Sequence, residues 1–225
     1  ITILHPTYTI GANDIANGSV YLILTAYANG SCVDAVDTML LTIGLQPIAD
    51  AGPDDEMCET DVTYTLAGAS ATNATSVLWT TDGTGTFSDP TIVNPGYTPS
   101  LSDIQTGAVN LTLTAYGDGT CPDASDFMVL TIWPEAQVFA GQNDTICEGS
   151  TFQPLDASAL NYTGLGWTTA GDGSFSDTSL LYPVYTPGAG DIATGSVVLT
   201  LTAFANGSCP DVSDDLTLFI SSQPV

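Results

Sequence analysis

The chain has 225 residues, of which 25 are Asp or Glu and none is Lys or Arg, so its formal net charge is −25 at pH 7. Nucleic acids and anionic membrane surfaces are bound through Lys and Arg, so this balance excludes both as partners of the segment. Only 11% of the residues are charged and 44% are apolar, which predicts a folded chain and not a disordered acidic tail. No apolar run approaches the ~20 residues of a membrane-spanning helix, and we expect no membrane insertion.

Residues 1–44 are interpreted as the C-terminal half of a repeating β-sandwich unit. The segment LILTAYANGSCVD recurs as LTLTAYGDGTCPD and LTLTAFANGSCPD, at a period of about 88 to 89 residues. The first half of each later unit carries another Cys and a Trp, and these have no counterpart before Cys32. We therefore expect that the N-terminal unit has lost its first half by truncation, and with it the partner of Cys32.

Residues 45–133 and 134–222 are predicted to be two complete units, and residues 223–225 to be the start of a further one. The final segment ISSQPV resembles IGLQPI, which opens the first complete unit. Apolar and polar residues alternate over 109–116 and again over 128–132, which is the period of a strand with one buried face. These two strands are predicted to form a hairpin.

Further short strands are predicted around 62–66 and 77–80, between turn clusters such as DGTG and NPGYTP. About six to eight short strands in ~90 residues are typical of an antiparallel β-sandwich. We therefore predict an all-β fold of tandem immunoglobulin-like (PKD-like) sandwiches. Short linkers that contain Pro predict that the sandwiches stack as a stiff rod.

One disulfide is predicted in each complete unit. The order Cys58, Trp79, Cys121 resembles the Cys, Trp, Cys order of immunoglobulin domains, except that Cys121 falls in the loop after the long strand. The expected bonds are Cys58–Cys121 and Cys147–Cys209, each running from the start of a sandwich to the tip of its last hairpin. Such bonds persist in oxidising compartments, so we expect an extracellular or cell-surface location.

The motifs WTTDGTGTF, NPGYTP, DIQTGAVNLTLTA and DFMVLTI resemble the PKD-like and immunoglobulin-like repeats of giant secreted cell-surface proteins of Bacteroidota. The resemblance covers essentially the whole chain, once per unit. It implies tandem β-sandwiches, an extracellular or cell-surface location and a structural or adhesive role. The W-D-F-G-D-G motif of PKD domains appears here as WTTDGTG and WTTAGDG, which departs from the strict PKD pattern.

Repeated carboxylates are the candidate ligands for a metal ion. They are the pairs Asp34 and Asp37, Asp123 and Asp126, and Asp211 and Asp214. The acidic residues of the glycine turns are not repeated between units, so we expect solvated carboxylates and no resident cofactor or metal site, with weakly bound divalent cations such as calcium as the alternative. Asp14, Asp103 and Asp191, each four residues before a glycine, are expected to cap local backbone amides in a turn.

Catalysis is not expected. His5 is the only histidine, its counterparts in the other units are Asn94 and Tyr182, and no cysteine pair has C-x-x-C spacing. The sequence thus lacks the base of a Ser or Cys hydrolase in the complete units, and it lacks the ligands of a zinc site. Trp79 and Trp167 are expected in the core and not on a sugar-binding surface.

The favoured function is a structural or adhesive stalk segment of a large extracellular repeat protein or surface filament. Its partners would be other repeats of the same chain or filament neighbours. A first alternative makes the units accessory glycan-binding modules of a secreted hydrolase, with Tyr27, Tyr116 and Phe204 as the contacts for surface glycans. A second alternative is a pilin-like subunit whose incomplete sandwich is completed by a strand of a neighbour.

Overall fold

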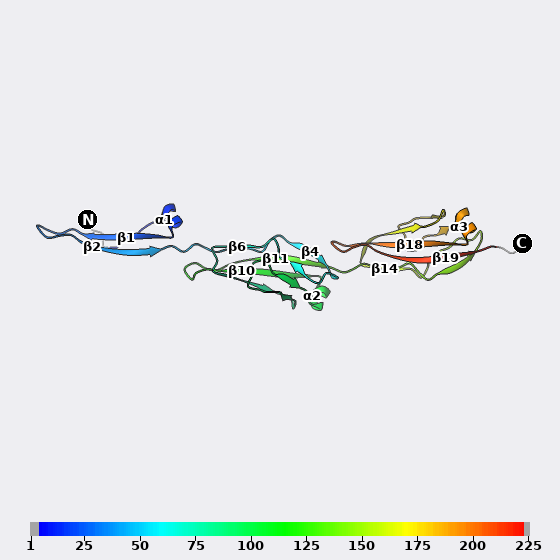
Figure 1. Cartoon of the computed structure of the whole chain (residues 1–225), viewed down its shortest axis with the longest axis horizontal. Helices are drawn as coiled ribbons and strands as arrows, with labels where there is room; N and C mark the ends of the chain where they lie inside the picture. The colour runs from blue at the N-terminus through cyan, green and yellow to red at the C-terminus, as the bar shows by residue number, and fades with distance from the viewer. Residues whose placement is uncertain (1–4, 223–225) are drawn as a thin grey trace.

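Three bodies follow one another along the long axis of the computed structural model, which describes residues 5–222 (Figure 1). The N-terminal body is a hairpin with α1 (Ala12–Asn17), β1 (Ser19–Ala26) and β2 (Ala35–Thr42). Two sandwiches follow it, and their long strands run along the same axis. This end-to-end row agrees with the expectation from the short linkers. The predicted start of a further unit at 223–225 lies outside the described residues.

The first sandwich contains ten elements. They are β3 (Ile48–Asp50), β4 (Asp55–Cys58), β5 (Tyr64–Thr65), β6 (Ser70–Thr72), β7 (Ser76–Thr81), β8 (Thr86–Phe87), β9 (Gly96–Thr98), α2 (Leu101–Thr106), β10 (Ala108–Tyr116) and β11 (Ala124–Trp133). The larger sheet has the order β4-β11-β10-β7, with β4 parallel to β11 and the other neighbours antiparallel. The pair β3-β6 and the sheet β5-β9-β8 supply the rest of the core.

The second sandwich repeats this architecture. Its elements are β12 (Gln137–Phe139), β13 (Asp144–Cys147), β14 (Ser158–Leu160), β15 (Tyr162–Thr169), β16 (Ser174–Phe175), β17 (Tyr185–Thr186), α3 (Ala189–Thr194), β18 (Ser196–Ala205) and β19 (Val212–Ser221). The larger sheet has the equivalent order β13-β19-β18-β15, again with its edge strand β13 parallel to β19. The predicted all-β fold and the predicted hairpins are confirmed.

Each sandwich has its own core, formed by the inward residues of the long hairpin and by one row of aromatic rings. Trp79 is 2% exposed and packs at 5.9 Å between ring centroids on Phe87, which packs at 5.0 Å on Tyr97. The second sandwich repeats the row with Trp167, Phe175 and Tyr185. The predicted core position of both tryptophans is therefore confirmed.

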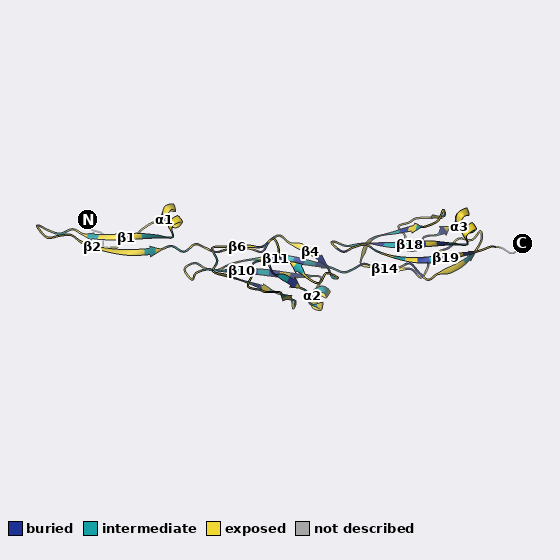
Figure 2. Ribbon diagram, viewed as in Figure 1, coloured by how far each residue is buried: buried dark blue, intermediate teal, exposed yellow. Residues whose placement is uncertain are grey.

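The N-terminal hairpin has the same alternating sequence but buries little of it (Figure 2). Leu24 is 68% exposed, whereas its counterpart Leu113 is fully buried. Met39 is 56% exposed, whereas its counterpart Met128 is 2% exposed. Among the described residues, β1 and β2 pair only with each other, so no second layer covers their apolar face.

A six-residue helix precedes each long strand, where the sequence pattern predicts only a turn. The third helical residue is an Asp whose carboxylate accepts the N–H of the N-cap residue, and the helix ends at a glycine with positive φ. The three aspartates are Asp14, Asp103 and Asp191, and the three glycines are Gly18, Gly107 and Gly195. The predicted capping role of these aspartates is confirmed.

Candidate functional site at the sandwich junction

The disulfide in the structure joins the two sandwiches to each other, so the pairing predicted within each unit is wrong. Cys58 is bonded to Cys209, across 151 residues of sequence and with the Cα atoms 4.8 Å apart. Cys121, Cys147 and Cys32 are free. The predicted bond ran from the start of a sandwich to the hairpin tip of the same unit, whereas the observed bond runs to the hairpin tip of the next unit.

The length of strand β11 explains why the predicted pairing fails. Cys58 ends β4 and lies opposite Trp133, the last residue of β11, whereas Cys121 lies in the loop before the first residue of β11. A strand of ten residues spans roughly 30 Å, far more than the ~7 Å that a disulfide can bridge between Cα atoms. Cys147 and Cys209 are separated in the same way by β19. Stacking places the hairpin tip of the second sandwich at the end of β11.

Trp133 of the first sandwich contacts the hairpin tip of the second at this junction, and Glu56 and Glu59 of its own sandwich hold it in place. The Cys209 Sγ lies 3.4 Å from the Trp133 carbonyl oxygen, which also accepts the Glu59 N–H at 2.8 Å. The Trp133 indole N–H donates to the Glu56 carboxylate at 2.7 Å. Gly207 of the hairpin tip lies directly against this indole, so closely that a Cβ at position 207 would overlap the ring. A side chain at this position would therefore force the two sandwiches apart.

The junction between the N-terminal hairpin and the first sandwich has the same geometry. The Cys121 Sγ lies 3.5 Å from the carbonyl oxygen of Gly44, which is the counterpart of Trp133. Thr120 packs so closely on Gly44 that a Cβ there would lie 2.9 Å from the Thr120 Cβ. Each hairpin tip therefore rests on the strand end of the unit before it. The two junctions differ in that only the second contains a bonded cysteine partner.

The linker before each sandwich accepts a hydrogen bond from an asparagine side chain of that sandwich. The Asn73 side-chain amide donates to the Gln46 carbonyl at 3.1 Å, and the Asn161 amide donates to the Glu135 carbonyl at the same distance. Both asparagines have a left-handed backbone, with φ of 54° and 56°, which Asn tolerates better than most residues. Both asparagines begin an Asn-x-Thr triplet, which did not predict this structural role, although their repeated position in the two units was a usable signal.

A buried carboxylate holds the glycine turn of each sandwich to its helix. Asp103 is 2% exposed and accepts the Tyr97 hydroxyl, the Ser100 N–H and the Thr84 N–H, each at 2.9 Å. A Cβ at Gly83 would collide with the same carboxylate, so glycine is required in the WTTDGTG motif. Asp191 makes the equivalent contacts in the second sandwich.

Hydrogen bonding decides the charge state of these buried groups. Burial raises the pKa of Asp103, but the hydrogen bonds from Ser100, Thr84 and Tyr97 outweigh it and hold the pKa below its ordinary value. Burial, with the adjacent carboxylate as a further cause, raises the pKa of Tyr97 to about 12. The pair is therefore an anionic carboxylate with a neutral tyrosine at neutral pH. Its contacts are saturated, which makes it a structural support and not an acid–base site.

The repeated carboxylates considered as calcium ligands accept backbone hydrogen bonds in the structure. Asp123 accepts from Gly117 at 3.0 Å and Asp126 accepts from Ala51 at 2.9 Å. Asp34, Asp211 and Asp214 make the corresponding contacts with Ala28, Ala205 and Ala140. Within residues 5–222, no group of three or more His, Cys, Asp or Glu side chains is placed to hold a metal ion.

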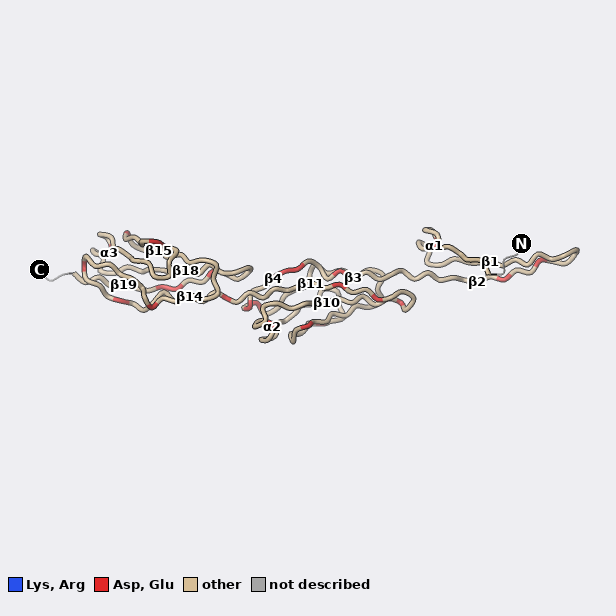
Figure 3. Tube along the Cα trace, turned by 180° about the vertical axis from the view of Figure 1, so that it is seen from behind, with Lys and Arg blue, Asp and Glu red and all other residues tan. Residues whose placement is uncertain are grey.

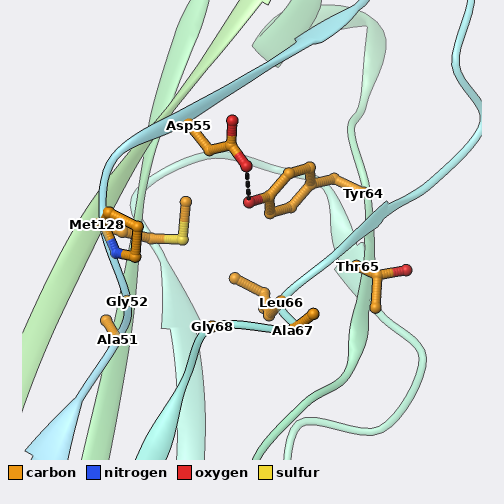
Figure 4. Close-up of a pocket in the computed structure, with 10 residues that line it drawn as sticks. Ala51, Gly52, Asp55, Tyr64, Thr65, Leu66, Ala67, Gly68 and Met128 are labelled. Carbon is orange, nitrogen blue, oxygen red and sulfur yellow. Dashed lines mark hydrogen bonds between the residues drawn. The ribbon is translucent and has the colours of Figure 1, made fainter.

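A small cavity lies between β4 and β5 of the first sandwich (Figure 4). Its volume is about 160 Å³, below the ~300 Å³ at which small-molecule sites begin. The Tyr64 hydroxyl donates to the Asp55 carboxylate at 2.6 Å across its mouth. The tyrosine of this pair is replaced by Phe152 in the second sandwich, so the pair does not repeat. Both its size and its occupied polar groups argue against a ligand site here.

The aromatic side chains proposed for glycan contact do not share one environment. Tyr27 is 85% exposed and Phe204 is 43% exposed, whereas Tyr116 is half-buried. Phe204 lies over the backbone of Gly164 and Gly166 in its own sheet. The ring pairs of the described chain are all in the two cores.

The acidic residues are spread over all three bodies (Figure 3). In the part of the chain that the structure describes, no helix is long and apolar enough to cross a membrane.

Solved structures similar to this chain share its fold at low sequence identity, while no protein-family model and no curated protein matches it. Extracellular domains 3–5 of Drosophila OTK align with a TM-score of 0.50 and 11% identity, over 84% of this chain and 66% of that one. Titin domains I67–I69 align with a TM-score of 0.48 and 12% identity, over 92% of this chain and 74% of that one. Cadherin domains 1–4 of protocadherin gamma B7 align at 0.45 and 15%, over 92% of this chain and 58% of that one. The OTK alignment supports an immunoglobulin-like sandwich fold for the chain.

Proposed function

We propose that the chain is a load-bearing stalk segment of an extracellular repeat protein or surface filament, with a structural or adhesive role and no catalysis. The Cys58–Cys209 bond is the observation that supports this function, because it connects two sandwiches and not two strands of one. It also supports an oxidising, extracellular location. The proposed units are residues 1–44, 45–133 and 134–222.

The bond alters how a pulling force travels along the chain. Cys58 lies near the start of the first sandwich and Cys209 near the end of the second, so tension enters at one sulfur and leaves at the other. The 151 residues of sequence between them cannot extend while the bond is intact. Most of both sandwiches is thereby shielded from a force applied at the chain ends, which suits a segment that must keep its length under load.

Single-molecule force spectroscopy on the full chain, held at its two ends, tests this function. Opening the bond should release about 540 Å of additional extension, at roughly 3.6 Å for each of the 151 extended residues. We expect this gain with reductant and in the Cys58→Ser/Cys209→Ser variant. The Cys32→Ser variant, which changes an exposed free thiol, is the matched control and should extend like the wild type. Equal extension with and without the bond would exclude a load-bearing role for it.

The finer proposal is that the parent protein is a giant secreted surface protein of Bacteroidota with PKD-like repeats. It rests on the resemblance of the WTTDGTG, NPGYTP and DFMVLTI motifs, to which the structure adds a physical reason for the glycines of the first motif. Weakly bound divalent cations, calcium among them, are proposed as counterions between neighbouring stalks and not as resident cofactors.

A further inference from the structure

The parallel edge strand of the larger sheet has the same position relative to the long hairpin in both sandwiches. In the first sandwich, β4 covers the edge of β11, with Asp55 opposite Leu130 and Cys58 opposite Trp133. In the second, β13 covers the edge of β19, with Cys147 opposite Ser221. In both cases a strand that ends in cysteine completes the sheet. The cysteine is thereby held at the end of its unit, next to the position of the hairpin tip of the following unit.

Among residues 5–222, no such strand covers the corresponding edge of the N-terminal hairpin. Its residues 41–44 correspond to residues 130–133 of β11, and in the described chain β2 pairs only with β1. An exposed strand edge offers unpaired N–H and C=O groups to an added strand. In both complete units a cysteine-ended strand, β4 or β13, covers this edge. A strand of the same type is therefore expected to pair with the edge of β2.

The position of Cys121 supplies an independent indication. Its Sγ lies 3.5 Å from the Gly44 carbonyl, as the Cys209 Sγ lies 3.4 Å from the Trp133 carbonyl. A strand bound to β2 in the register of β4 would place its cysteine opposite Gly44, and so beside Cys121. At the equivalent place in the second junction, the same arrangement holds the observed bond to Cys58.

We propose that the edge of β2 together with Cys121 is a binding site for a cysteine-ended strand of the β4 type, which Cys121 then holds through a disulfide. Cys147 is the complementary half of the same joint, and it takes the hairpin-tip cysteine of a following unit. The Cys58–Cys209 bond is thus one of a series of disulfides, which we call the disulfide ladder, that joins each unit to the next. This inference rests on the proposed stalk function, but it concerns different cysteines.

Formation of the disulfide at Cys121 requires an oxidant. The two thiols give up two protons and two electrons to a small-molecule disulfide such as oxidised glutathione. The S–S bond of that molecule breaks to give two thiols, and the new protein S–S bond forms. The docked strand determines which protein thiol reacts, because it raises the local concentration of its cysteine at Cys121 alone.

A strand-capture experiment tests the site on the full chain with its native bond intact. A synthetic peptide of residues 51–60, AGPDDEMCET, is added in a glutathione redox buffer, and the modified thiol is located by mass spectrometry after peptic digestion in acid. We expect the peptide on Cys121 at about ten times the yield on Cys32, although Cys32 is the more exposed thiol. A scrambled peptide that keeps the cysteine position should lose this preference. Modification that follows exposure, with Cys32 ahead, would overturn the proposal.

A lengthened chain tests the other half without depending on the N-terminal hairpin. A second copy of residues 134–222 is inserted after residue 222, and the disulfides of the product are mapped. We expect Cys147 bonded to the tip cysteine of the added unit, with Cys58–Cys209 unchanged. A bond between Cys147 and Cys209, or a free Cys147, would refute the disulfide ladder. Either result is independent of the force measurement, because that measurement reads only the Cys58–Cys209 bond.

Discussion

Replacement of Asp103 by Asn tests whether a buried carboxylate holds the first sandwich together. One carboxylate oxygen accepts the Tyr97 hydroxyl and the Ser100 N–H, and the other accepts the Thr84 N–H. Asn has the same shape but only one acceptor oxygen. Its NH₂ group must therefore face a donor that has lost its partner. The variant loses at least one hydrogen bond to a charged group, and two if the amide turns the other way.

The expected loss of stability follows from these contacts. A hydrogen bond to a charged group contributes about 1.5–3 kcal/mol, so Asp103→Asn should lower the free energy of unfolding of the first sandwich by about 2–4 kcal/mol. Asp14→Asn is the matched control. Asp14 accepts the Tyr8 hydroxyl at 2.6 Å in the same motif, but on the exposed hairpin, where water replaces the lost partner. Its effect should be far smaller.

Hydrogen exchange read by mass spectrometry can assign the loss to one sandwich. We expect protection to fall in β10 and β11, while β18 and β19 of the same molecule serve as the reference. Unchanged protection in β10, or an equal effect of Asp14→Asn, would refute the reasoning.

The stability difference between wild type and Asp103→Asn should also depend on pH, in a direction that the pKa of Asp103 determines. The folded-state pKa of Asp103 lies below its ordinary value, so its contribution is complete above the unfolded-state pKa of about 3.9 and is lost as the pH falls through the folded-state pKa. Asn does not titrate. In urea unfolding, the difference between wild type and Asp103→Asn should therefore be largest near neutral pH and shrink in strong acid. A difference as large in strong acid as at neutral pH would contradict a charged carboxylate in the folded state.

Three further predictions use matched sites or conditions. Trp79→Phe should destabilise its sandwich by about 1 kcal/mol more than Trp167→Phe, as measured by hydrogen exchange. The Trp79 indole N–H donates to a carbonyl at 3.1 Å, whereas the buried Trp167 N–H finds no acceptor among residues 5–222, and equal losses would contradict this reasoning. Gly207→Ala should speed reduction of the inter-sandwich disulfide by dithiothreitol, because its Cβ meets Trp133. Gly119, the counterpart of Gly207, also has a positive φ (89° against 52°) but open space around it, so Gly119→Ala should not speed the reduction. Divalent cations should promote lateral bundling and raise the melting temperature, and a chelator that caused no shift would refute this.

The sequence was sufficient for the parts of the fold that depend on local pattern. The alternation around Leu111 and Leu113 predicted a half-buried strand, and the structure buries both residues completely. The spacing of Asp103 before Gly107 predicted a capped turn, but not the six-residue helix that the cap begins. A helix of that length lacks a full apolar stripe, so periodicity could not identify it.

The disulfide partners could not be predicted from the order of cysteines along the chain. Pairing Cys58 with Cys121 assumed that the two cysteines of one unit are also neighbours in space, as in immunoglobulin domains. The decisive fact is that β4 runs parallel to β11, which carries Cys58 to the end of the strand farthest from Cys121. Strand direction is a tertiary property that hydrophobic alternation does not encode, since the alternation is the same in either direction.

The charge of the chain explains why a covalent bond is suited to this junction. Without Lys or Arg, the carboxylates near Trp133 have no basic side chain to pair with, and they accept N–H groups instead: Glu56 from the Trp133 indole and Glu59 from the Glu135 backbone. The remaining charges repel one another, and that repulsion grows as the ionic strength falls. An S–S bond holds the two sandwiches at a fixed separation whatever the salt concentration. A junction of this kind can therefore keep its geometry in surroundings whose ionic strength varies, such as the space outside a cell.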